Sequence, residues 1–218
     1  MKKKFEDFRR AFRRALFPRD GVCVLCGKPA PASACLCGSC RASLPPRPNN
    51  DARRIEGIAR VRSAFVYAEP LRNLMHTFKY ENKRYVARFF AQVIDDFPRD
   101  CMLVGVPLHE QRLKERGFCQ TDELCYELSR ITGRTWHRDA LTRIRNTPSQ
   151  TTLSGDERSH NLENAFCARN VSGMSIILVD DVVSTGSTLR ECALTLRAAG
   201  AHQVYALTAC STEERPNA

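Results

Sequence analysis

The chain has 218 residues, 43% of them hydrophobic, which is enough for one α/β domain of common size and a small appended module. Lys and Arg number 34 against 24 Asp and Glu, and the resulting formal charge of +10 suits phosphorylated ligands or nucleic acid, with a solvated basic surface as the alternative. The 11 cysteines are an odd number in a chain that is long for a disulfide-stapled secreted fold, so we expect reduced thiols and a cytoplasmic location.

The first predicted element is a basic amphipathic helix over residues 1–17. Its large apolar residues recur every three or four positions: Phe5, Phe8, Phe12 and Leu16. We expect this face to dock on the chain's own domain, with a membrane surface or a polyanion as the alternatives. Charges within this segment exclude the apolar core of a signal peptide, and no stretch is apolar enough to span a membrane, so we expect a soluble protein.

Two Cys-x-x-Cys pairs follow, Cys23 with Cys26 and Cys37 with Cys40. This spacing lets four thiolates converge on one tetrahedral zinc ion, and four protein ligands make the zinc structural, because no coordination position stays open for chemistry. A redox pair is the alternative. Cys35 lacks the spacing and is expected to be a spare thiol.

Residues 44–51 are rich in Pro and Asn and are interpreted as a linker. The predicted domains are therefore residues 1–50, with the basic helix and the zinc module, and residues 51–218, with the α/β domain. Alternating residues predict an early strand or hairpin arm over 58–67, and helical stripes follow over 71–80 and 86–97.

Residues 101–109 form a short apolar run that ends in Val106-Pro107-Leu108-His109. In a doubly wound sheet, such a run is a strand that ends at the ligand-binding crevice. A plain strand followed by a proline turn is the alternative.

Residues 111–120, with the sequence QRLKERGFCQ, lead from that strand into a helix containing Leu124 and Leu128. Arg112 and Arg116 are suited to phosphate oxygens, because a guanidinium makes two charge-assisted hydrogen bonds to one phosphate group. The polar stretch between Trp136 and Phe166 is long for a connection in a compact domain, which indicates a lid or disorder. A last strand is predicted over residues 202–208.

Residues 176–189, with the sequence IILVDDVVSTGSTL, organise the rest of the chain. The four apolar residues predict a strand buried on both faces of a parallel sheet, with two carboxylates at its carboxyl end and a hydroxyl-and-glycine turn before a helix. Amides at a helix N-terminus hold a phosphate, and carboxylates hold hydroxyl groups, so the pattern predicts a sugar-phosphate site. An ordinary buried strand with an acidic turn is the alternative.

This run resembles the 5-phosphoribosyl-1-pyrophosphate (PRPP) motif of type I phosphoribosyltransferases. The resemblance implies that Asp180 and Asp181 face the ribose hydroxyls, directly or through magnesium and water, and that residues 184–188 wrap the 5′-phosphate. The motif comprises Asp180, Asp181, Val182, Ser184, Thr185, Gly186, Ser187 and Thr188. It implies an α/β fold with a phosphoribosyltransferase-like parallel sheet flanked by helices.

Residues 112–120 narrow the likeness to the ComF family of competence-associated proteins, whose pattern Arg-x-x-x-Arg-Gly-Phe-Asn-Gln this chain keeps except for Cys119 in the Asn position. A thiol cannot supply the amide contacts of Asn. The four-cysteine module and Lys79-Tyr80 also match in order. Further binding residues implied by the resemblance are Lys79, Val106, Pro107, Leu108, His109, Arg112, Arg116, Arg143, Gln150 and Arg158, and no catalytic residue is assigned.

Two functions follow from this resemblance. The protein binds PRPP and magnesium and handles incoming single-stranded DNA in natural competence, with competence proteins as partners; alternatively, it is an active phosphoribosyltransferase acting on a base or amine. Any DNA attraction is expected outside the PRPP pocket, from residues 2–14 and from Arg41, Arg47, Arg53 and Arg54.

Overall fold

A computed structural model describes residues 21–31, 34–45, 53–81, 83–92, 97–145 and 164–212, which form two compact units divided after Ser43. The expected helix over residues 1–17 lies outside the described residues, as do Arg47, Gln150 and Arg158. Among the described helices, none combines the length and the apolar composition that crossing a bilayer would require.

The small unit is built around two turns that carry the cysteine pairs. Val22 and Pro29 form an antiparallel bridge, and within it the Cys23 amide donates to the Lys28 carbonyl at 2.8 Å. The second pair lies at the start of the short helix α2 (Gly38–Ala42), where the Arg41 amide donates to the Cys37 carbonyl.

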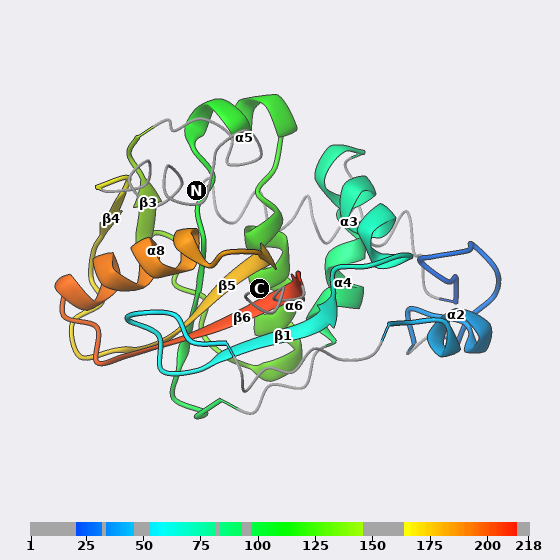
Figure 1. Ribbon diagram of the computed structural model, residues 1–218, viewed down its shortest axis with the longest axis horizontal. Helices are drawn as coiled ribbons and strands as arrows, with labels where there is room; N and C mark the ends of the chain where they lie inside the picture. The colour runs from blue at the N-terminus through cyan, green and yellow to red at the C-terminus, as the bar shows by residue number, and fades with distance from the viewer. Residues whose placement is uncertain are drawn as a thin grey trace, which may run out of the picture. The chain divides into compact units, whose positions relative to one another are not determined.

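The large unit contains a four-stranded sheet, and all of its strand pairs are parallel. The strands are β1 (Val61–Val66), β2 (Met102–Gly105), β5 (Ser175–Val183) and β6 (Gln203–Ser211), in the order β1-β6-β5-β2 (Figure 1). The predicted parallel sheet is therefore confirmed, and the apolar run of residues 176–179 lies at its centre with each residue buried.

Helix α8 (Ser187–Ala198) covers one face of the sheet. Ile176 and Leu178 of β5 share a core cluster with Leu189 and Leu196 of α8. Because strand side chains alternate, Ile177 and its neighbours of the same parity point to the other face.

Helix α6 (Gln120–Thr132) covers that other face. Gly105 of β2 is in register with Val179 of β5, and a Cβ added to Gly105 would lie 3.2 Å from Thr121 Oγ1 of α6. Helices α3 (Leu71–Tyr80) and α4 (Val86–Ala91) add an aromatic cluster. In it, the rings of Phe78 and Phe90 lie 6.3 Å apart, and Phe90 belongs to α4, which packs on α6.

Two short elements flank the sheet. Helix α5 (Glu110–Arg116) follows β2, and strands β3 (Leu141–Arg143) and β4 (Phe166–Ala168) form an antiparallel pair that contacts α8. The polar stretch in which the sequence indicates a lid or disorder thus begins and ends in this pair of strands, while residues 146–163 lie outside the described residues.

The strands of the sheet end at different levels. Strand β2 ends at Gly105, whose register partner is Val179, whereas β5 continues to Val183 in register with β6. The sequence predicts a strand that ends where the carboxylates begin, but the strand includes both of them. Continued pairing with Thr208 and Cys210 of β6 explains the extra length.

Candidate functional site

Asp180 and Asp181 occupy the part of β5 that extends beyond β2. Strand alternation places Asp180 on the same face as α8 and Asp181 on the opposite face, where Lys79 Nζ lies 3.1 Å from Asp181 Oδ2. The Asp181 amide donates to Asp180 Oδ1 at 2.8 Å. Adjacent acids with different partners are therefore held at one end of the sheet.

The electrostatics of the three charged groups are coupled. Burial, and second the charge of Asp181, raise the pKa of Asp180 to about 8. Burial alone would lower the pKa of Lys79, but the carboxylates of Asp181 and Asp180 outweigh it and raise that pKa. The Lys79 ammonium therefore stays charged beside the Asp181 carboxylate, and Asp180 holds its proton more tightly than an ordinary aspartic acid.

Arg143 adds positive charge beside Asp180, and Arg112 lies close enough to Arg143 to act on its pKa. Burial, and second the charge of Arg112, lower the pKa of Arg143, while the Asp180 carboxylate acts in the opposite direction. Strand β3 supplies Arg143 and helix α5 supplies Arg112, so two elements that follow β2 bring two guanidinium groups near each other, and the Arg143 group acts on Asp180.

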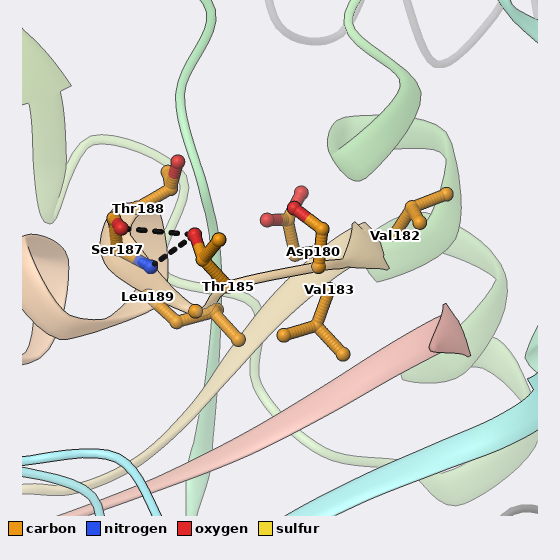
Figure 2. A pocket seen from close by; sticks show the side chains of 9 residues that line it. Asp180, Val182, Val183, Thr185, Ser187, Thr188 and Leu189 are labelled. Carbon is orange, nitrogen blue, oxygen red and sulfur yellow. Dashed lines mark hydrogen bonds between the residues drawn. The ribbon is translucent and has the colours of Figure 1, made fainter. Parts of the chain in front are cut away.

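A pocket lies in the turn between β5 and α8, lined by Asp180 and residues 182–189. Thr185 Oγ1 lies 2.9 Å from Ser187 Oγ and accepts a hydrogen bond from the Ser187 amide at 3.4 Å. Figure 2 shows the hydroxyl groups of Thr185, Ser187 and Thr188 gathered beside Asp180. Because α8 begins at Ser187, its first amides and these hydroxyls offer the donors of a candidate anion site.

Gly186 has a left-handed backbone, with φ of 85°, which favours glycine. A Cβ at this position would also lie 2.7 Å from Ile55 Cδ1, so a side chain would collide with the segment behind the turn. The predicted Thr-Gly turn therefore depends on glycine for both its conformation and its packing.

Arg53 lies behind the same turn, which differs from its predicted place on a DNA-binding surface. Its side chain is 9% exposed, Nη1 donates to the Ser184 carbonyl at 2.5 Å, and Nη2 donates to the Thr212 carbonyl at 3.0 Å. The assignment of Arg53 to an exposed surface is wrong, because both carbonyls lie beyond the ends of the central strands and the guanidinium supplies their donors. Arg54 and Arg41 are exposed as expected.

The segment after β2 is only partly available to a ligand. The Val106 amide donates to the Val179 carbonyl at 2.9 Å, and the Val106 carbonyl accepts from Thr121 Oγ1 at 2.7 Å, so Val106 continues the sheet. His109 Nδ1 accepts from the Gln111 amide at 3.3 Å and caps α5. Pro107 and Leu108 lie between these two anchors.

Gln120 connects the basic motif to the acid pair. It is 1% exposed, and its Oε1 accepts from Arg116 Nη1 at 3.0 Å while its Nε2 donates to the Lys79 carbonyl at 3.4 Å. The Arg116 guanidinium also lies over the Tyr80 ring. Helix α5 is thereby fixed to the end of α3, from which Lys79 reaches Asp181.

Cys119 takes the N-cap position of α6 without a side-chain cap hydrogen bond. Its Sγ lies 3.0 Å from Thr121 Oγ1, and burial raises the pKa of the thiol to about 11. At neutral pH, Cys119 is therefore a protonated, buried thiol and does not act as a nucleophile.

The sulfur atoms of Cys23, Cys26, Cys37 and Cys40 lie within 4.8 Å of one another, so this cluster could hold a metal ion. Cys26 Sγ and Cys37 Sγ are 3.7 Å apart, close to the roughly 3.8 Å between two sulfurs that each lie ~2.3 Å from one tetrahedral zinc. The Ser39 hydroxyl, 3.4 Å from Cys37 Sγ, is the main cause that lowers the pKa of Cys37 to about 6. The donor set thus fits zinc, which binds thiolates.

Sequence reasoning placed most of the site's residues but missed three. The acids, the turn and Lys79 meet at one end of the sheet, whereas Gln150 and Arg158 lie outside the described residues. Gln120 was signalled by its place at the end of the 112–120 motif. Ile55 and the buried position of Arg53 carry no local signal, because their partners are far away in the sequence.

Comparisons with known proteins agree with these features. The phosphoribosyl transferase domain family matches residues 117–217. The chain is 34% identical over 210 residues to the DNA utilization protein YhgH of Salmonella typhi, covering 91% of this chain and 88% of that protein. It is 31% identical over 196 residues to Competence protein F of Haemophilus influenzae, covering 84% and 81%. Competence protein ComFC of Bacillus subtilis is 30% identical over 185 residues, covering 77% and 68%.

Proposed function

This chain belongs to the ComF family of competence-associated proteins, and we propose that its pocket binds PRPP together with magnesium. We further propose that the protein takes part in the handling of DNA. The observation that carries the proposal is the junction of β5 and α8. There, two carboxylates on the protruding strand end lead directly into a hydroxyl-and-glycine turn at a helix N-terminus. These are the groups that a ribose and its 5′-phosphate require.

In this proposal, each part of PRPP meets a different group. The turn of residues 184–188 holds the 5′-phosphate through its amides and hydroxyls, and Asp180 and Asp181 accept hydrogen bonds from the ribose hydroxyls. Arg143, which acts on Asp180, and its neighbour Arg112 are the residues to which we assign the pyrophosphate, together with Pro107 and Leu108. Carboxylate oxygens suit magnesium, so the two acids are the residues that would hold it, and the ion would neutralise phosphate charge.

Titration calorimetry with PRPP, with and without magnesium, tests this assignment. We expect saturable binding at one site per chain that weakens when magnesium is removed. Absence of binding in the presence of magnesium would contradict the proposal. Assaying pyrophosphate release with bases and amines separates the alternative, since phosphoribosyl transfer frees one pyrophosphate per turnover and binding alone frees none.

The DNA part of the proposal rests on the formal charge of +10 and on the membership of this family. We expect weak, sequence-independent binding of single strands that fades as salt rises, with a log–log slope near ~−0.7 per neutralised phosphate. Fluorescence anisotropy of a labelled oligonucleotide at several salt concentrations measures this slope. Saturating PRPP should leave much of the affinity, because the exposed Arg54 and Arg41 do not line the pocket.

Charge reversal of single arginines tests which surface of the protein binds DNA. Arg54→Glu should weaken DNA binding and reduce the salt slope, while Arg99→Glu is the matched control, because Arg99 is also exposed but precedes β2 at the opposite end of that strand from the pocket. Complete displacement of DNA by PRPP, with Arg54→Glu unchanged, would mean that DNA occupies the phosphate pocket itself.

A further inference from the structure

The segment of residues 53–55 contacts the turn of residues 184–188 without lining the pocket. Arg53 and Ile55 touch Ser184 and Gly186, yet neither is among the residues that line the pocket. These contacts join residues 131 positions apart in the sequence.

The guanidinium of Arg53 closes the end of the β5–β6 pair. The Thr212 amide donates to the Val183 carbonyl at 2.9 Å, which continues the pairing of the strands. The next acceptors, the carbonyls of Ser184 and Thr212, both receive their hydrogen bonds from Arg53. A rigid fork of donors holds both carbonyls at once, which a lysine ammonium does with less geometric definition.

Holding the Ser184 carbonyl fixes the direction of the following amide. In a trans peptide, the carbonyl and the N–H of one unit point in opposite directions. The carbonyl of the Ser184–Thr185 peptide points at Arg53, so the Thr185 N–H points away from Arg53. A cationic donor on the carbonyl also polarises the peptide and strengthens its N–H as a donor to an anion.

Ile55 supports the next residue of the turn. Because its Cδ1 would lie 2.7 Å from a Cβ on Gly186, the side chain fills the space behind that glycine. Gly186 precedes α8, whose first amides face the anion site. The segment of residues 53–55 therefore determines where two consecutive parts of the turn lie.

We infer that Arg53 is a positioning residue for the phosphate subsite, and that it orients the Ser184–Thr185 peptide toward the 5′-phosphate without touching the ligand. This inference rests on the proposed function of the pocket. It predicts that changing Arg53 weakens the binding of a sugar monophosphate selectively. Binding of pyrophosphate, which the proposed function assigns to Arg112 and Arg143, should be spared.

The experiment measures the affinity of the full chain for ribose 5-phosphate and for inorganic pyrophosphate with magnesium by calorimetry. We expect Arg53→Met to weaken ribose 5-phosphate binding by about tenfold, because it removes a charged donor from the turn. Pyrophosphate affinity should change by less than about twofold. Arg53→Lys, which keeps the charge, should fall between Arg53→Met and wild type, and Arg99→Met, at an exposed arginine before β2, should match wild type.

Each outcome decides the question. Failure of the wild type to bind ribose 5-phosphate overturns the pocket and the inference together. If the wild type binds and Arg53→Met binds equally well, the inference is wrong and the pocket stands. Equal loss of both ligands would mean that Arg53 supports the fold in general. If Arg53→Met does not fold, the same comparison is made with Arg53→Lys, and equal loss of both ligands in that variant overturns the inference.

Discussion

Replacing Asp180 and Asp181 together with Asn is expected to weaken PRPP binding by about 100-fold or more. The Asp181 carboxylate accepts hydrogen bonds as a charged group, a contact that contributes ~1.5–3 kcal/mol, and a cation such as magnesium favours the ionised form of Asp180, which then adds a second such contact. The pair also supplies the oxygens suited to magnesium. Calorimetry with PRPP and magnesium measures the loss, and Asp100→Asn is the control, because Asp100 is exposed before β2.

The two single substitutions should differ. Asp180→Asn leaves the 3.1 Å pair of Lys79 and Asp181 in place, whereas Asp181→Asn removes the carboxylate that raises the pKa of Lys79. We therefore expect Asp181→Asn to lower both affinity and stability, and Asp180→Asn to lower affinity alone. Equal PRPP affinity in wild type and the double variant would remove both acids from the pocket.

The difference in stability between wild type and Asp180→Asn should depend on pH in a defined direction. The pKa of Asp180 is raised from its ordinary value of 3.8 to about 8, so the folded state holds its proton more tightly than the unfolded state. Wild-type stability is therefore lost as pH rises between these values, and Asn avoids the loss. In urea unfolding at pH 9, the free energy of unfolding of the variant should exceed that of wild type by at least ~1.4 kcal/mol, which is the equivalent of a pKa difference of one unit. This excess should become smaller as the pH is lowered toward 5.

Replacing Cys23 with Ser is expected to abolish zinc binding and unfold the small unit. Four thiolates within 4.8 Å of one another repel unless a cation joins them, and zinc contributes ~10–16 kcal/mol to the folding of such modules. Elemental analysis should find one zinc per chain in wild type and none in the variant. The large unit has its own core cluster, so its unfolding transition should persist.

Cys35→Ser is the matched control for the zinc prediction. Cys35 lies between the two pairs, but its sulfur is not part of the four-thiol cluster. The control should keep its zinc. Wild-type protein without zinc, or with four freely titrating thiols at the cluster, would contradict the structural metal, and loss of zinc from Cys35→Ser would show that the ligand set is different.

Local patterns in the sequence were sufficient for the central strand and the cysteine cluster. Residues 176–179 are buried as their apolar run predicts, because the run alone requires cover on both faces. The end of β5 could not be predicted from the run, since Asp180 and Asp181 are poor strand formers. Their strand conformation comes from pairing with β6, which lies more than twenty residues later.

The misplacement of Arg53 has a similar cause. An arginine in a basic segment is usually solvated, and no sequence pattern near residue 53 predicts that its side chain is buried. Its two acceptors are carbonyls 131 and 159 positions away, so only the tertiary fold reveals them. The resemblance to a family supplied the site's motifs, but backbone acceptors leave no residue-type signature in any motif.

The order β1-β6-β5-β2 has a consequence for how the protein is made. The last strand lies between β1 and β5, so β1 stays without its neighbour until residues 203–211 have been synthesised. At ~5–20 residues per second, this delay lasts on the order of ten seconds, during which strand edges are exposed to aggregation. A chain that terminates before β6 leaves β1 unpaired and Arg53 without its Thr212 acceptor, so premature termination should abolish the pocket even when all of its lining residues have been translated.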